Sequence, residues 1–247
     1  MTRREKPRET VKRFLIMCEG ANTEPCYFEL IRDKLGLPAN QIVVDVLHQS
    51  HTNPAGILQD AKNTRDAHAE EVKKAKKKGD TREREYDAIW IVFDTEGPQN
   101  GRAGSLKAVR GSAANHKINV AESTPSFEVW YLLHVKPSPP ACSTATDAEK
   151  ALKAVFAAEN SKLKKENKTL KELCPAYGKT KADAEAVAKW ALAEARTFNA
   201  VQNARATFTS GGMTRTGVHL LVEALRAQAT PAAQRAIGWP WSVRTKR

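Results

Sequence analysis

The sequence has few of the residues that mark secreted, zinc-binding or membrane proteins. Only four of its 247 residues are cysteines, and none stands in a Cys-x-x-Cys pair or with histidines in a zinc pattern. This scarcity favours free thiols in a reducing compartment over a disulfide framework. The longest apolar runs are about one strand long, and no signal-peptide core follows the first residues, MTRREK. The sequence therefore predicts a cytoplasmic protein without a membrane span.

Acidic residues are also in short supply relative to basic ones. The 40 lysines and arginines exceed the 28 aspartates and glutamates by 12 charges. Such a surplus favours an anionic partner, most commonly nucleic acid, although solubility and loose basic segments are the alternative. The densest basic run consists of Lys73, Lys74, Lys76, Lys77 and Lys78. We expect this run either to follow a nucleic-acid backbone or to form a solvated helix face.

The apolar pattern predicts an α/β fold. Strands are expected at 11–18, 41–48, 86–93 and 118–121. Helical patterns follow them at 25–35, 54–78, 105–115 and 126–135. This alternation predicts a mostly parallel sheet of about four strands with helices on its faces. Further helices are expected at about 146–160, in a Lys-rich piece to 173, and at 180–200 and 216–229.

The chain is long enough for one large domain with an appendage. We expect a polar, flexible end at 1–10 and a catalytic α/β core at 11–135. A Pro/Ser-rich linker at 136–145 leads to a helical extension, 146–247, packed on that core.

Carboxylates follow two of the predicted strands. Glu19 comes after the first strand, and Asp94 and Glu96 come after the third. Ligands of open α/β sheets bind at the carboxyl ends of strands, so these acids converge if the two strands are neighbours. A hard divalent cation, Mg²⁺ or Mn²⁺, would relieve their repulsion and support phosphoryl transfer. We assign Asp94 and Glu96 to the metal and Glu19 to proton transfer, with a solvated turn as the alternative for the pair.

Two further glutamates lie in predicted helices. Glu24 is five residues beyond Glu19 at a helix start, where it either supports the site or interacts only with the helix dipole. Glu128 shares a face with Leu132 in an otherwise apolar helix, and a carboxylate on a packed face needs a partner. The metal site is one such partner, for Glu128 as a ligand or base. A buried ion pair or the helix dipole is the alternative.

Other candidates are substrate contacts. Lys179 and Lys181 follow Tyr177 and Gly178 and would clamp a phosphate, although a solvated basic face is favoured. His134 lies near a helix end, where a structural histidine is favoured over a substrate contact.

Four blocks of this sequence resemble the RloB family. Residues 18–28, CEGANTEPCYF, match its opening pattern CEGxxTEPxYF, and residues 86–96 contain a strand that ends in an acidic pair. Residues 123–134, STPSFEVWYLLH, are similar to its third pattern, SNPxFExWLLLHF. Residues 214–223 resemble a weaker closing block, so the likeness runs from about 11 to 226.

The resemblance implies a Toprim-like core, as in topoisomerases, primases and overcoming-lysogenisation-defect nucleases. These proteins use a glutamate after the first strand and a DxD pair after a later one. By this correspondence Glu19, Asp94 and Glu96 form the catalytic metal set, although the pair here is Asp-Thr-Glu. Thr124 and Val135 also depart from the family pattern, where Asn and an aromatic are usual. These departures put the metal preference in question more than metal binding.

The resemblance also implies a role in bacterial antiphage defence, commonly beside an ABC-type ATPase, and it permits a homodimer. The sequence thus predicts a Mg²⁺- or Mn²⁺-dependent nuclease acting on RNA, tRNA or DNA. One alternative is a nucleic-acid-binding or regulatory subunit of an ATPase-linked complex. Another is a different Toprim phosphoryl transfer, such as primase-like synthesis. A nucleotide phosphohydrolase also stays open, since a metal site would serve it without a Walker-type loop.

Overall fold

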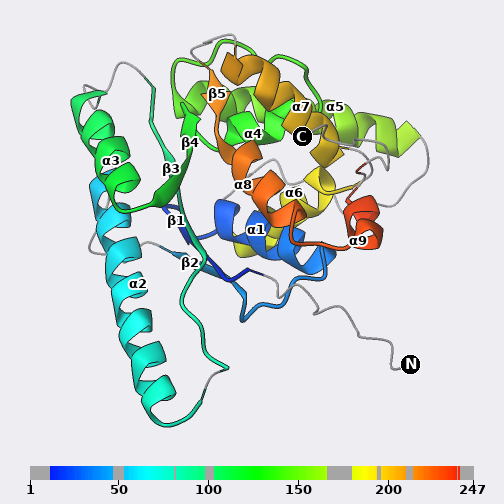
Figure 1. The fold of residues 1–247 in the computed structure, drawn as a ribbon. Helices are drawn as coiled ribbons and strands as arrows, with labels where there is room; N and C mark the ends of the chain where they lie inside the picture. Colours follow the sequence, from blue (N-terminus) through cyan, green and yellow to red (C-terminus); the bar gives the residue numbers. More distant parts are fainter. Residues whose placement is uncertain are drawn as a thin grey trace, which may run out of the picture.

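The computed structural model of the chain describes residues 12–46, 53–80, 82–97, 103–165, 180–193, 196–209, 214–237 and 239. Strands and helices alternate through its first half (Figure 1). They are β1 (Phe14–Cys18), α1 (Thr23–Lys34), β2 (Ile42–Val46), α2 (Pro54–Lys77), β3 (Ala88–Asp94), α3 (Ala103–Asn115), β4 (Ile118–Thr124) and α4 (Glu128–Leu133). The second half is mainly helical. It contains α5 (Ala145–Lys165), α6 (Lys181–Ala191), α7 (Arg196–Thr209), β5 (Arg215–Thr216), α8 (Val218–Arg226) and α9 (Pro231–Ala236).

The described strands form one five-stranded sheet in the order β2-β1-β3-β4-β5. The first four are parallel, which confirms the predicted α/β fold with a mostly parallel sheet. Strand β5 is an antiparallel addition that the sequence did not predict, and it pairs Thr216 with Ser123 and Arg215 with Thr124. It is two residues long, so it shows no alternating pattern, and the predicted helix 216–229 had overlapped it. That helix begins later, as α8, and α9 follows it.

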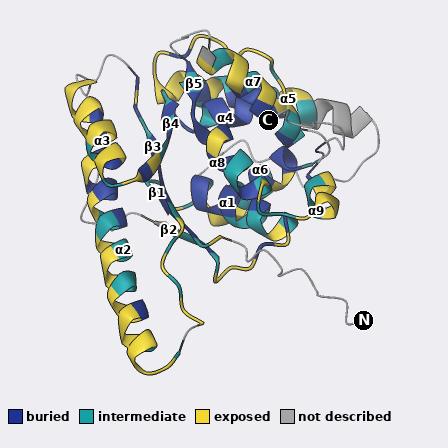
Figure 2. Cartoon of the chain, in the orientation of Figure 1, coloured by how far each residue is buried: buried dark blue, intermediate teal, exposed yellow. Residues whose placement is uncertain are grey.

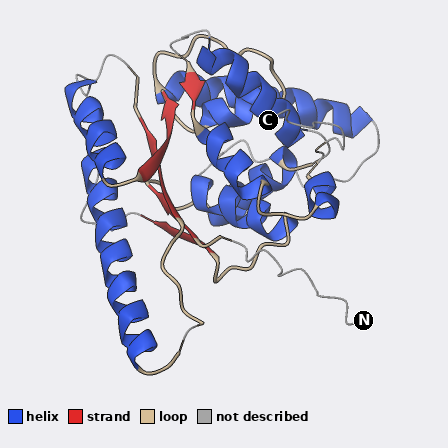
Figure 3. Ribbon diagram, in the orientation of Figure 1, coloured by secondary structure: helices blue, strands red, loops and turns tan. Residues whose placement is uncertain are grey.

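Alternating side chains of the strands supply two hydrophobic layers. In β1, Phe14, Ile16 and Cys18 face one side, and Leu15 and Met17 face the other. Helices α2 and α3 cover the second side, and α1, α4 and the C-terminal helices cover the first (Figures 1 and 3). The outward surfaces of α2 and α3 are exposed (Figure 2). The sheet is therefore the middle layer, and only its edges and strand ends are open to ligands.

The helices after the predicted linker pack on the same core. Leu152 of α5, Val187 of α6 and Leu221 of α8 belong to one hydrophobic cluster with the first face of the sheet. The linker itself is attached, because the backbone N–H of Cys142 donates to Thr214 Oγ1 at 2.9 Å. The predicted helix 180–200 is two helices, α6 and α7. The end at 1–10 and most of the Lys-rich piece to 173 lie outside the described residues.

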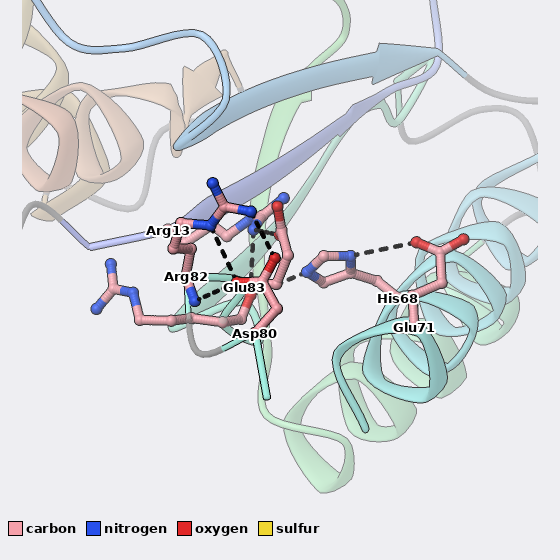
Figure 4. Close-up of polar contacts among 7 residues, drawn as sticks. Arg13, His68, Glu71, Asp80, Arg82 and Glu83 are labelled. Atoms are coloured by element: carbon pink, nitrogen blue, oxygen red, sulfur yellow. Dashed lines mark hydrogen bonds and ion pairs between the residues drawn. The ribbon is translucent and has the colours of Figure 1, made fainter. Parts of the chain in front are cut away.

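The loop from α2 to β3 is fixed at the amino end of the sheet (Figure 4). The Arg13 guanidinium donates to Glu83 at 2.7 Å, and the backbone N–H of Arg13 donates to Asp87 at 2.7 Å. His68 of α2 lies 2.9 Å from the carbonyl oxygen of Arg84. Because β1 begins beside Arg13, these contacts place the C-terminal end of α2 near the amino edge of the strands. The exposed lysines of that end are Lys73, Lys74, Lys76, Lys77 and Lys78.

A carboxylate cluster at the carboxyl edge of the sheet

Glu19 and Asp94 meet at the ends of neighbouring strands. Strands β1 and β3 pair in parallel with Cys18 opposite Val92, which confirms the expected neighbours. The backbone N–H of Glu19 continues this ladder to the Val92 carbonyl at 3.0 Å. Beyond it, the backbone N–H of Asp94 donates to Glu19 Oε2 at 2.9 Å. The Glu19 carboxylate is thus held against the start of the Asp94 loop, and both residues keep part of their surface exposed.

Glu24 reaches the same edge from the first turn of α1. Its side chain is buried, at 5% exposure, against the backbone of Gly20. A Cβ atom on Gly20 would lie 2.3 Å from Glu24 Oε2, so the position has no room for a side chain. Burial raises the pKa of Glu24 to about 7, and the charges of Glu128 and Glu19 add to this shift, against backbone hydrogen bonds that lower it.

Glu128 approaches from α4, opposite Glu24. Its carboxylate accepts a short hydrogen bond from Ser126 Oγ and is partly exposed. Burial raises the pKa of Asp94 well above its usual range, and the charges of Glu24, Glu128 and Glu19 raise it further. A hydrogen bond from the Phe127 backbone acts in the opposite direction. These mutual effects show that the four carboxylates lie close enough to repel one another.

Glu96 lies on the rim of this cluster. Its side chain is exposed, and its backbone has a φ of +58°, in the left-handed region that few non-glycine residues adopt. Its N–H donates to the carbonyl of Pro125 at 2.8 Å. Gly97 follows with a φ of +88°, and a Cβ there would lie 2.3 Å from the Ser143 carbonyl oxygen. The chain thus turns sharply after Asp94 and carries Glu96 to an exposed position.

The predicted basic contacts are dispersed. Lys181 begins α6, where its carbonyl lies 4.0 Å from the Cys26 thiol in the first turn of α1. Its side chain is exposed. Lys179 lies outside the described residues. The lysines at the end of α2 are separated from the carboxylates by the length of the strands, at least about 15 Å.

His134 is packed inside the aromatic core. It is 2% exposed, and the rings of Tyr27, Trp130 and Tyr131 surround it. Its Nδ1 donates to the Trp130 carbonyl at 2.9 Å, and burial lowers its pKa to about 3. A neutral ring in this position stabilises the junction of α1 with α4 and has no direct path to substrate.

The donor chemistry of the cluster matches a hard divalent cation. Carboxylate oxygens are the ligands that Mg²⁺ and Mn²⁺ prefer, and the charges that shift the pKa of Asp94 are all negative. Within the described part of the chain, however, no three His, Cys, Asp or Glu side chains are arranged as a ready metal site. The residues that would hold a metal are therefore Glu19 and Asp94, with Glu24 or Glu128 completing the set by side-chain rotation.

Three supporting residues were not identified from the sequence. Gly20 gives the Glu24 carboxyl its space, Ser126 orients Glu128, and the Phe127 backbone binds Asp94. The glycine and the serine lie inside the family-like blocks at 18–28 and 123–134, which were the available signal.

Comparison with known proteins gives one match. The model of the family described as RloB-like protein matches residues 14–225, which is most of the chain. All four carboxylates of the cluster lie within this range. No curated protein and no solved structure matches the chain. No helix among the described residues has the length and apolar character needed to cross a membrane.

Proposed function

The chain belongs to the RloB-like protein family, and from this premise and the carboxylate cluster we propose that it is a metal-dependent nuclease. Its substrate would be RNA, including tRNA, or DNA, and its metal Mg²⁺ or Mn²⁺. The observation that carries the proposal is the convergence of Glu19, Glu24, Asp94 and Glu128 at the carboxyl edge of the sheet. Clustered acids at this edge are costly without a cation and useful with one.

The residues would divide the chemistry among them. Bound Mg²⁺ or Mn²⁺ would supply charge neutralisation and an activated water. Glu19 and Asp94 would hold it, since the hydrogen bond from the Asp94 backbone fixes the Glu19 carboxylate at the site. Whichever of Glu24 and Glu128 stays off the metal would accept the proton of the attacking water. Lys181 would approach the substrate phosphate from the start of α6.

The biological setting follows from the family resemblance. We propose a cytoplasmic effector of bacterial antiphage defence that acts beside a partner such as an ABC-type ATPase. A homodimer is compatible with this role. The positive net charge of 12 supports a nucleic-acid substrate over a free nucleotide.

The proposal is tested by incubating the protein with tRNA, single-stranded RNA, plasmid DNA and linear DNA, each with Mg²⁺, Mn²⁺ or EDTA. Glu19→Gln and Asp94→Asn are the key variants, because they remove charge with little change of shape. We expect cleavage by the wild type with metal only, and a loss of at least about 100-fold in each variant. Cleavage by both variants at the wild-type rate would refute the assigned site.

A regulatory or binding subunit is the second candidate. It is favoured by one observation, that no three described side chains form a ready metal site. Calorimetric titration with Mn²⁺ separates the two: a site lost in Asp94→Asn supports the nuclease, and absence of metal binding supports the subunit.

A further inference from the structure

A groove of about 510 Å³ runs along the outer edge of β4. Arg110 of α3 and Lys117, which follows that helix, form one wall, and Phe208 and Leu220 form the other. Strand β5 and Gly217 pair with only the last residues of β4, Glu122 to Thr124. The groove therefore opens beside Ile118–Val120, at the end of the sheet opposite β2.

Its apolar wall is unusually exposed. The described residues include three large exposed hydrophobic side chains, and two of them, Phe208 at 45% and Leu220 at 43%, line this groove. The Arg215 guanidinium lies over the Phe208 ring, 5.8 Å from its centroid. The His219 ring meets Phe208 edge-on at 5.8 Å. Phe208 is thus held in place by two neighbours while much of its surface remains available.

The opposite wall and the rim are cationic. Lys107 and Arg110 lie one turn apart on α3, and Lys117 follows the same helix. Arg110 is neutralised by two hydrogen bonds to Glu122, at 2.7 and 2.9 Å. Lys107, Lys117 and Arg215 form no ion pair with any residue that the structure describes. Of these side chains, Arg110 and Lys117 line the groove itself, and Arg215 lies over the Phe208 ring at its rim. An aromatic platform beside such cations fits a ligand that is both planar and anionic.

One end of the groove, at Glu122 and Gly217, lies near the carboxyl edge of the sheet, and the groove runs from there toward the amino end of β4. Asp94 of β3 is in register with Ser123 of β4, which is in register with Thr216 of β5. Two strand spacings of about 4.8 Å separate Asp94 from Thr216, or roughly 10 Å. Arg215, opposite Thr124, therefore lies on the same edge of the sheet as the carboxylates. One polymer strand can contact both places.

We propose that this groove binds an unpaired nucleotide of the substrate, with its base stacked on Phe208 and with different phosphates of the same strand near Arg215 at one end of the groove and near Lys117 at the other. The inference rests on the proposed nuclease function and narrows its substrate to single-stranded or locally unpaired RNA or DNA. A base can stack on an aromatic side chain only when it has left its own helix, so an intact duplex cannot use the groove. Phe208 and Arg215 are binding residues that position the strand across the carboxylates.

The test measures binding without cleavage. Glu19→Gln protein is titrated against fluorescently labelled eight-nucleotide RNA and DNA, in EDTA and again in Ca²⁺. Each oligonucleotide is used as a single strand and as a duplex with its complement. We expect Phe208→Ala to weaken single-strand binding roughly tenfold, and Phe208→Trp to retain it. Arg215→Gln should lower the salt slope by about one, whereas Phe208→Ala should leave the slope unchanged. A 2-aminopurine in the oligonucleotide should be quenched on binding, and Phe208→Ala should relieve the quenching.

The matched control replaces all five lysines at the end of α2 by glutamine, and it should bind these short strands like the parent. The proposal is overturned if Phe208→Ala binds as tightly as the parent, if it weakens duplex binding equally, or if no single strand binds.

Amide hydrogen exchange slowed at Asn119–Ala121 in a complex with a peptide, without nucleic-acid binding, would instead assign the groove to an added β-strand. This test measures binding and not cleavage. Failure of the nuclease assay therefore does not decide whether the groove binds a nucleotide, and failure of binding here does not decide whether the protein is a nuclease.

Discussion

The Glu19 carboxylate accepts a hydrogen bond from the backbone N–H of Asp94 at 2.9 Å, across two strands that are 75 residues apart in the chain. The contact exists because β1 and β3 are neighbours in the sheet although β2 lies between them in sequence. It leaves the Asp94 carboxylate beside that of Glu19, with Glu24 close by. The fold therefore maintains a repulsive arrangement of acids that a well-packed core would otherwise exclude.

Glu24→Gln should stabilise the metal-free protein at alkaline pH. The folded-state pKa of Glu24, about 7, is raised above its ordinary value of 4.5, so this carboxyl favours the folded state at low pH and loses that contribution as the pH rises through 7. Glutamine does not titrate, so the variant should have the higher free energy of unfolding. We expect the difference from the wild type to be up to about 3 kcal/mol at pH 8 and below about 1 kcal/mol at pH 5. Urea unfolding in EDTA at both pH values measures it.

The exposed Glu85 provides the control for that experiment, since Glu85→Gln removes one negative charge far from the cluster. It should leave the free energy of unfolding within about 0.5 kcal/mol at both pH values. If Glu24→Gln behaves like this control, the Glu24 carboxyl is not held with a raised pKa in the folded protein, by burial or by its acidic neighbours.

Glu128→Gln should impair metal-dependent cleavage far more than Glu96→Gln. Glu128 raises the pKa of Asp94 and so lies within reach of a shared cation, whereas Glu96 is exposed on a left-handed turn. We expect a loss of at least about 100-fold for Glu128→Gln and less than tenfold for Glu96→Gln. Single-turnover rates and thermal unfolding of both variants are the measurements. An equal loss would favour the Asp94 and Glu96 pair predicted from the sequence.

The position of Glu19 and Asp94 could be predicted from the sequence because it depends only on strand order and strand ends. The sequence also offered Glu24 and Glu128 for this site, each beside an alternative role. Choosing between the roles depends on side-chain packing, namely on the space at Gly20 and the turn before α4, which no periodicity reveals. The contact of Arg215 with Phe208 could not be predicted from the sequence for another reason. A two-residue strand has no pattern, and its partner β4 is about 90 residues earlier in the chain.

Replacing the five lysines from Lys73 to Lys78 by glutamine should affect only long substrates. The run lies near the amino edge of the sheet, and α2 is roughly 36 Å long, so a strand of a few nucleotides can occupy the carboxylates without contacting it. We expect unchanged cleavage of short oligonucleotides, but weaker binding and a smaller salt slope for substrates the size of tRNA. Filter binding at several salt concentrations tests this. Equal effects on short and long substrates would place the run beside the active site.

His134 should make the protein sensitive to acid. Its folded-state pKa, about 3, is lowered from an ordinary value of 6.5 because burial disfavours the charged ring. Between these two values the unfolded chain binds a proton that the folded protein does not, so stability is complete above pH 6.5 and falls as the pH drops toward 3. Between pH 7 and pH 5 the free energy of unfolding of the wild type should fall by about 2 kcal/mol relative to that of His134→Gln, which has no titrating ring. Other titrating groups are common to both proteins and cancel in the difference. Urea unfolding of both at pH 7, 6 and 5 measures this difference, and a constant value would mean that the imidazole can take up its proton within the fold.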